Sequence, residues 1–206
     1  MALRAESRLE LVDLGTVPLD EAVGVLARGM RDNPIHIAAF GSNPERRVRI
    51  LYRMFSDLFR VMKRWGGVCA LRDGDVVGVA GRAEEGACMP NTVQKLRLAP
   101  GMLAVGPRTS LRTTRWMTAW ANRDPTEPHS HFGPLAVDTH LQGKGIGSAL
   151  LANYCASLDA RGTLGYLETD KAENVTLYER HGFTVVGEAE VLGVPNWFMR
   201  REAART

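Results

Sequence analysis

The sequence is poor in the features that mark secreted, membrane and nucleic-acid-binding proteins. Its 206 residues include only three cysteines, and its 26 basic and 23 acidic residues leave a net charge of only +3. Widely spaced Cys69, Cys88 and Cys155 predict buried thiols in a reducing cytoplasm rather than a disulfide framework or a metal site. The balanced charge requires no nucleic acid as a partner.

Long apolar runs are also missing. None approaches the roughly 20 residues that a membrane-spanning helix needs, and charged residues interrupt the N-terminus, which is not typical of a signal peptide. We therefore expect no membrane partner and a cytoplasmic location. A hydrophobic fraction of 45% with 24% charged residues is ordinary for a globular protein. The length favours a single domain over residues 1–206.

What the chain does have is a glycine-rich loop between a short apolar run and a helix-like segment. The run Leu135-Ala136-Val137 is followed by Asp138, and the loop continues as Gln142-Gly143-Lys144-Gly145-Ile146-Gly147-Ser148. Glycines let a ligand approach the backbone closely. The free N–H groups and the dipole of a helix start attract anions, most often phosphate. The pattern therefore predicts a phosphate-type site.

Two common phosphate loops do not fit this pattern. A Walker A loop needs Ser or Thr after its lysine, but Gly145 follows Lys144. A dinucleotide fingerprint needs its third glycine three residues after the second, whereas Gly147 comes two residues after Gly145. The spacing Gln142-x-x-Gly145-x-Gly147 instead resembles the acyl-CoA pyrophosphate loop of the GNAT N-acetyltransferases.

A second motif of that family follows in the expected order. The strand-like run 164–169 precedes Asn174 and Tyr178, which are four apart and so share one face of a helix. Gly182 fits the position that ends this helix, and Phe183 enters the next strand. The segment resembles the closing motif of the GNAT family. Several stretches near it are moderately similar to the puromycin N-acetyltransferase group: 167–169, Asn174, 183–185 and 197–200.

The resemblance covers essentially the whole chain and implies an α/β GNAT fold, a single central mixed sheet of about seven strands flanked by helices. Sequence patterns place the elements in a matching order. We expect strands at 7–13, 68–71, 75–83, 129–137, 164–169, 184–192 and 197–201, and helices at 18–31, 44–64, 109–121, 146–161 and around 174–178. Residues 33–41 are expected to be a short apolar connector. Residues 87–123 form an insertion divided by Pro90, Pro100 and Pro107.

The resemblance also implies acetyl-CoA as acyl donor, with no metal and no covalent enzyme intermediate. Tyr178 would protonate the leaving sulfur, since its ordinary pKa is near 10, and Asn174 would orient the cofactor. The residues expected to bind acetyl-CoA lie along the strand end, the loop and the closing helix: Leu135, Ala136, Val137, Gln142, Gly143, Lys144, Gly145, Ile146, Gly147, Ser148, Asn174 and Tyr178.

The general base is less clear, because this chain has no glutamate on the strand 129–137, where many relatives carry one. His131 points to one strand face with Gly133 and Leu135 and is one candidate. Glu168 on the neighbouring strand is the other. Both residues could equally be structural. His36 and Phe40 lie in the connector that usually forms a wall of the acceptor site, so we expect them to bind substrate.

The predicted reaction is transfer of an acetyl group, not an aminoacyl group, to a primary amine of a small-molecule acceptor by direct attack. Walls formed by the insertion 87–123 favour a small ligand. Two alternatives remain: a protein N-terminal or lysine acetyltransferase, and a non-catalytic acyl-CoA-binding sensor that would have lost the acid. We expect a monomer or a homodimer.

Overall fold

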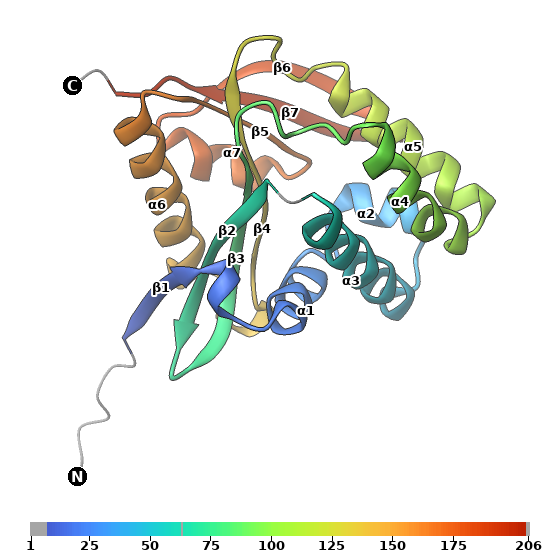
Figure 1. Cartoon of the computed structure of the whole chain (residues 1–206), viewed down its shortest axis with the longest axis horizontal. Coiled ribbons are helices and arrows are strands. Elements are labelled where there is room, and N and C mark those ends of the chain that lie inside the picture. Colours follow the sequence, from blue (N-terminus) through green and yellow to red (C-terminus); the bar gives the residue numbers. More distant parts are fainter. Residues whose placement is uncertain (1–7, 63, 205–206) are drawn as a thin grey trace.

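The protein is built around one seven-stranded mixed sheet, as the computed structural model of residues 8–62 and 64–204 shows (Figure 1). The strand order is β1-β2-β3-β4-β5-β7-β6, in which β4 and β5 are parallel and all other neighbours are antiparallel. The strands are β1 (Leu9–Asp13), β2 (Trp65–Arg72), β3 (Asp75–Ala83), β4 (His129–Val137), β5 (Leu164–Thr169), β6 (Thr184–Val191) and β7 (Val194–Arg201). The expected α/β fold with a mixed sheet of seven strands is confirmed.

Helices cover both faces of this sheet. They are α1 (Leu19–Gly29), α2 (Pro34–Phe40), α3 (Pro44–Val61), α4 (Thr92–Ala104), α5 (Pro107–Ala121), α6 (Ile146–Arg161) and α7 (Ala172–Glu179). One apolar core joins the sheet to α1, α2, α3 and α5, through buried side chains such as Leu26, Leu51 and Trp116. A second core, with Leu151 and Tyr178, joins the other face to α6 and α7.

The central parallel pair separates after a short contact. β4 and β5 pair only from His129 to His131 and from Leu164 to Tyr166, although β4 continues to Val137 and β5 to Thr169. On its other side β4 stays paired with β3 as far as Val137. The two strands therefore form a fork, and within the described residues the β4 edge that faces β5 has no strand partner beyond His131.

The sequence located most elements, including β4, α6 and β5 with the same bounds. The hairpin turn also follows from the sequence, since Asp73 and Gly74 both have positive φ, as an Asp-Gly turn of this kind requires. The expected connector 33–41 is instead largely the helix α2, and the insertion holds a helix, α4, that continues through Pro100. Residue 7 of the first expected strand and residue 63 of the expected helix 44–64 lie outside the described residues.

Among the residues that the structure describes, no helix combines the length and the apolar character needed to cross a bilayer.

Candidate active site

The glycine-rich loop leads from the end of β4 to the start of α6. Asp138 anchors its beginning, because its carboxylate contacts Arg28 of α1 at 2.7 Å and its N–H donates to the carbonyl of Val77. The side-chain amide of Gln142 donates to the carbonyl of Val137 at 3.1 Å, which ties the loop back onto the strand. These contacts hold both Asp138 and Gln142, and so the first half of the loop, in place.

Gly143 and Gly145 have the backbone conformation that favours glycine. Their φ angles are 77° and 80°, and a Cβ built on either residue meets no atom within 4 Å. The space in front of the loop is therefore open. Gly147 lies in the first turn of α6, where a Cβ would lie 3.7 Å from Val137.

The N-terminus of α6 presents free donors at this loop. Its first main-chain hydrogen bond runs from Ala149 N–H to the Gly145 carbonyl, and Gly145 makes no side-chain cap. The N–H groups of Ile146, Gly147 and Ser148 therefore have no acceptor in the preceding turn. Ser148 also contacts His181 Nε2 through its hydroxyl at 2.8 Å. Together with the helix dipole, these donors suit an anion such as pyrophosphate.

Tyr178 stands on α7 beside the fork. Its ring makes edge contacts with Phe132, the first β4 residue past the paired segment, and with Phe183. Tyr154 and Tyr166 are also buried, and their hydroxyls donate to backbone carbonyls at 2.7 and 2.8 Å. Among the described residues, the Tyr178 hydroxyl makes no such bond. Burial, with the charges of Asp170 and Glu168, raises the pKa of Tyr178 above its usual range, so the hydroxyl stays protonated.

Asn174 precedes Tyr178 by one helical turn. Its side-chain amide donates to the Thr169 hydroxyl at 3.4 Å, at the C-terminal end of β5. Asn174 therefore lies at the end of β5 and Tyr178 lies beside the fork, and their contact with a cofactor stays a prediction.

His131 and Glu168 meet where the two strands separate. His131 Nε2 lies 2.9 Å from Glu168 Oε2, and the Glu168 side chain is only 3% exposed. Burial lowers the pKa of His131, but the charge of Glu168 and contacts with Asp124 and Cys88 outweigh burial and raise it well above its usual value. The two base candidates are thus one ion pair, in which neither residue acts independently of the other.

The comparisons with known proteins agree with this geometry. The acetyltransferase (GNAT) domain family matches residues 115–185, which hold the loop, the fork and most of the Tyr178 motif. A Corynebacterium glutamicum protein described as "histone acetyltransferase HPA2 and related acetyltransferase" superposes with a TM-score of 0.67 at 18% identity, over 96% of this chain and 98% of that one. The chain has the GNAT fold.

Two further acetyltransferase structures show the same architecture. The ribosomal-protein-S18-alanine N-acetyltransferase of Escherichia coli has a TM-score of 0.57 at 16% identity, covering 97% of this chain and 96% of that one. A GNAT acetyltransferase of Brucella melitensis in complex with acetyl-CoA has 0.53 at 17%, covering 97% and 91%. The domain match is limited to residues 115–185, and these structures show the fold alone, so they do not identify the puromycin N-acetyltransferase group.

The two expected substrate-binding residues lie in an aromatic cluster on α2. His36 is 2% exposed and Phe40 3%, their rings stack 5.6 Å apart, and Trp116 of α5 contacts both edge-on. His36 Nδ1 lies 2.7 Å from the Met30 carbonyl, and burial lowers its pKa. Phe40 also lines a groove of about 420 Å³ whose other residues include Arg46, Arg108 and Arg112. Direct substrate contact by His36 stays a prediction.

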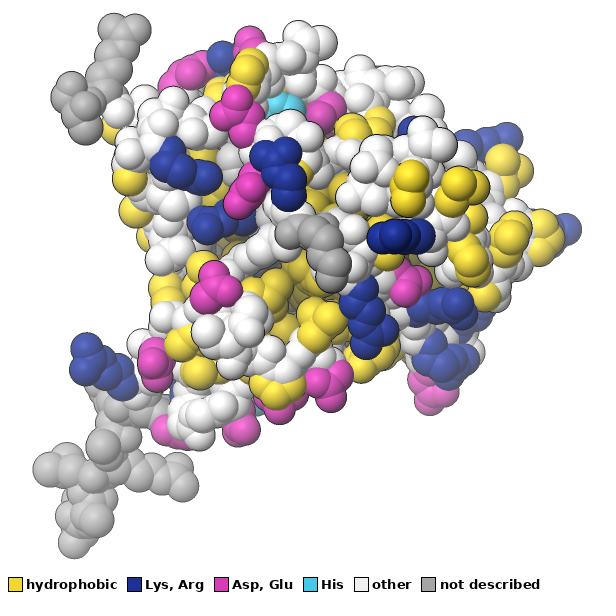
Figure 2. Space-filling model, in the orientation of Figure 1, with side chains coloured by type: hydrophobic (Ala, Val, Ile, Leu, Met, Phe, Trp, Pro, Cys, Tyr) yellow, Lys and Arg dark blue, Asp and Glu magenta, His cyan; other side chains and the backbone are white. Residues whose placement is uncertain are grey.

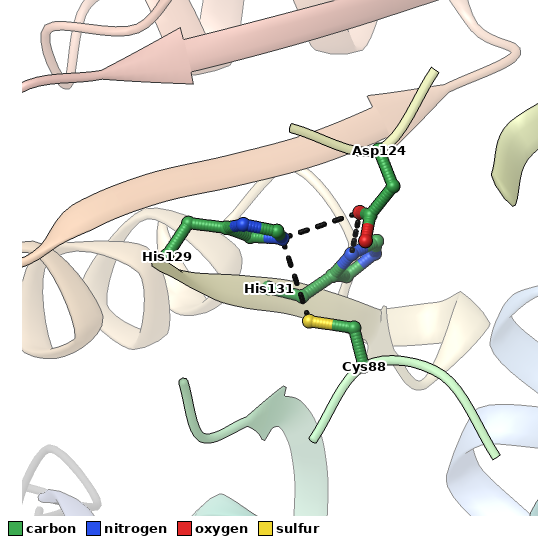
Figure 3. A group of neighbouring side chains, drawn as sticks. All are labelled: Cys88, Asp124, His129 and His131. Carbon is green, nitrogen blue, oxygen red and sulfur yellow. Dashed lines mark hydrogen bonds and ion pairs between the residues drawn. The ribbon is translucent and has the colours of Figure 1, made fainter. Parts of the chain in front are cut away.

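A polar cluster that the sequence analysis did not predict contains His131, and it includes Cys88, which was expected to be a buried thiol but is only partly buried. It consists of Cys88, Asp124, His129 and His131, whose donor atoms all lie within 4.8 Å of one another (Figure 3). His129 and His131 share a face of β4 because they are two residues apart. Cys88 and Asp124 come from the segments that precede α4 and follow α5. The His-x-His spacing on a strand was the available signal for this cluster.

Proposed function

We propose that this chain is an acetyl-CoA-dependent N-acetyltransferase that transfers an acetyl group to a primary amine of a small-molecule acceptor. One arrangement carries the proposal: an anion-binding helix start, an unpaired strand edge and a protonated tyrosine without a hydrogen-bond partner among the described residues meet at one fork. An acyl-CoA donor needs, in order along its length, a site for its pyrophosphate, backbone partners for its pantetheine arm and an acid for its leaving sulfur.

The cofactor would lie along the loop and the open edge of β4. The N–H groups of Gln142 to Ser148 would bind the pyrophosphate, with Lys144 nearby as a cation. The backbone of Leu135, Ala136 and Val137 would bind the pantetheine amides and the thioester carbonyl. Backbone donors aimed at a developing oxyanion are commonly worth about 3–4 kcal/mol each in acyl transfer. Asn174 would orient the arm that reaches Tyr178.

The chemical step is direct attack. The neutral amine nitrogen forms a bond to the thioester carbon, and the carbon–sulfur bond then breaks. The Tyr178 hydroxyl gives its proton to the leaving sulfur, so that free CoA thiol is the product. The proton that the amine loses must reach a base on the acceptor side.

We assign the role of this base to Glu168. Both nitrogens of His131 already face acidic groups, Nε2 toward Glu168 at 2.9 Å and Nδ1 toward Asp124 at 3.5 Å. Nε2 is engaged by Glu168 and Nδ1 is fully buried, so neither nitrogen can reach the amine. In this assignment Glu168 accepts the hydrogen bond and then the proton of the amine, while His131 holds the carboxylate in place. His131 as the base itself remains the rival assignment.

The acceptor class is tested by measuring CoA thiol release with acetyl-CoA and two acceptor panels, small primary amines and short peptides with free N-termini or lysines. Turnover confined to the small amines supports the proposal. Turnover with peptides alone would point to a protein acetyltransferase. Tight acetyl-CoA binding with no release in either panel would point to a sensor domain.

Three finer predictions belong to the same proposal. The moderate similarity to the puromycin N-acetyltransferase group favours that subgroup, and puromycin belongs in the amine panel for this reason. Cys69, Cys88 and Cys155 form no disulfide with one another, which fits a cytoplasmic location. We expect a monomer or a homodimer, which sedimentation at several concentrations distinguishes.

A further inference from the structure

We propose that Cys88, Asp124, His129 and His131 bind a zinc ion that fastens both ends of the insertion to the central strand. The proposal does not depend on the acetyl-transfer activity. Each donor is a ligand that zinc takes in proteins, since the set combines a thiolate, two imidazoles and a carboxylate. The thiolate and the carboxylate carry two negative charges, which a divalent cation balances.

The distances within the cluster match a tetrahedral site. With Zn–N and Zn–O bonds of about 2.0–2.2 Å and Zn–S bonds of about 2.3 Å, the ligand atoms of such a site lie about 3.3–3.7 Å apart. Asp124 Oδ1 lies 3.2 Å from His129 Nε2 and 3.5 Å from His131 Nδ1. Cys88 Sγ lies 3.4 Å from His129 Nε2. All other pairs of donor atoms lie within 4.8 Å, so only small movements would complete the tetrahedron.

The outer contacts fix which imidazole nitrogens face the centre. His129 Nδ1 lies 2.9 Å from the Glu127 carbonyl, and a carbonyl can only accept, so Nδ1 carries the proton. His131 Nε2 lies 2.9 Å from Glu168, where the same reasoning gives it the proton. A backbone carbonyl and a carboxylate behind the two rings are the usual partners of metal-binding histidines.

The remaining nitrogens then point their lone pairs at Asp124. His129 Nε2 and His131 Nδ1 both face Asp124 Oδ1, which also only accepts when it is ionised. His131 Nδ1 is fully buried and makes no hydrogen bond among the described residues. Facing acceptors repel unless a positive charge lies between them. Either each ring takes a second proton, or one metal ion serves the whole cluster, and the unpaired Nδ1 favours the metal.

The position of the cluster indicates what the ion would do. All four ligands would come from the protein, which is typical of structural rather than catalytic zinc. Cys88 lies just before α4, Asp124 just after α5, and both histidines lie on β4 (Figures 1 and 3). The ion would therefore close the insertion at its base and hold it beside the fork.

The first test is the metal itself. The full chain, freed of any affinity tag, is grown with zinc and its metal content measured, and apo protein is then loaded with Co²⁺. We expect one zinc per chain and a near-ultraviolet thiolate-to-cobalt absorption that Cys88→Ala abolishes. Cys155→Ala is the matched control, because Cys155 is a buried thiol on α6 outside the cluster, and it should keep both signals.

The second test follows the insertion by hydrogen exchange. Removal of zinc by a chelator should raise exchange in residues 88–128 while α6 stays protected, and added zinc should restore protection. Zinc-grown protein without bound metal, with no cobalt absorption and with exchange that the chelator leaves unchanged, would overturn the proposal. A cobalt signal that persists in Cys88→Ala would overturn the assignment of Cys88 as a ligand.

Discussion

The tyrosines of the second apolar core and the sheet differ in what their hydroxyl groups contact. Tyr154 and Tyr166 donate to the carbonyls of Ser130 and Arg123, so their hydroxyls hold segments of backbone. Tyr178 is equally buried but has no such partner among the described residues. The Tyr178 hydroxyl is not among the buried polar atoms that lack a partner, so it reaches accessible space, where a bound ligand can meet it.

Replacement of Tyr178 by Phe should remove that role with little change in packing. We expect kcat to fall by about 10²–10⁴-fold, the usual range for loss of a general acid, while the Kd for acetyl-CoA stays nearly constant. Tyr154→Phe is the matched control, because it removes a structural hydrogen bond and should lower stability by about 1 kcal/mol. An equal loss of affinity and rate in Tyr178→Phe would make this residue a packing group.

Glu168→Gln keeps the shape of the side chain and removes its charge. If Glu168 receives the amine, kcat should fall by about 10²-fold or more, and acetyl-CoA affinity should be unchanged. Glu188 on β6 is exposed, so Glu188→Gln is the control for loss of one negative charge. Full activity of Glu168→Gln would exclude it as the base and return His131 as the candidate.

Among the elements, α6 offers an internal comparison because both of its ends carry a left-handed glycine. Gly145 (φ 80°) begins the helix and Gly162 (φ 62°) ends it, and a Cβ on either meets no atom within 4 Å. Leucine should therefore cost about 1–2 kcal/mol of backbone strain at either position. Only Gly145→Leu puts a side chain where we place the pyrophosphate.

The expected result is a loss of CoA affinity of about tenfold or more for Gly145→Leu, which corresponds to about 1.4 kcal/mol. Gly162→Leu should bind CoA like the unchanged protein while losing similar stability. Isothermal titration with CoA and urea unfolding measure the two effects separately. Equal CoA affinity in both variants would remove the pyrophosphate from this loop.

The elements also show where sequence reasoning works. β4, α6 and β5 could be bounded from the sequence because their signals are local: glycines at the turns and apolar residues at fixed spacing. The helix α2 has Pro34 in its first turn and Gly41 as its C-cap, but it is only seven residues long, and the sequence analysis expected a connector there. Its first turn is held by Asp170, 135 residues away, whose carboxylate accepts from Ile35 N–H at 2.7 Å. No pattern near Ile35 reveals that contact.

The insertion 87–123 is a second region in which the sequence analysis missed a helix. Pro100 suggested a break, yet α4 runs through it, and the better signal was the capping box of Asn91 and Gln94 at its start. The cluster around His131 joins residues from three separate segments, so only the His-x-His spacing on β4 could have indicated it. Local chemistry was readable, whereas partners distant in the chain were not.

At the scale of the whole molecule, the insertion is also the part with the most exposed apolar surface. Figure 2 shows hydrophobic side chains gathered over α4 and α5, where Leu96, Leu103 and Leu111 are 70%, 77% and 53% exposed. The helix α4 buries no residue fully. The cluster that we propose as a zinc site lies at the base of this insertion, through Cys88 and Asp124.

The free energy of unfolding should depend on pH through His36, which packs against Phe40 and Trp116 of the first apolar core. Burial lowers its pKa, the charge of Asp170 opposes this, and Arg47 and Lys171 add to the lowering. In the unfolded chain the His36 imidazole is protonated near pH 6.5, whereas in the folded chain it is protonated only at lower pH. The contribution of neutral His36 to the free energy of unfolding is present above that pH. It is lost as pH falls, by at most about 1.4 kcal/mol per pH unit.

Urea unfolding between pH 7.5 and pH 5 measures this loss, with a chelator present so that metal release does not contribute. His36→Gln removes the titrating group, so its free energy of unfolding should be lower at pH 7.5 but should change less with pH than that of the unchanged protein. His140→Gln is the control, because the His140 side chain is 73% exposed and should leave the slope unaltered. Parallel pH curves for His36→Gln and the unchanged protein would mean that α2 accommodates a charged imidazole without loss of stability.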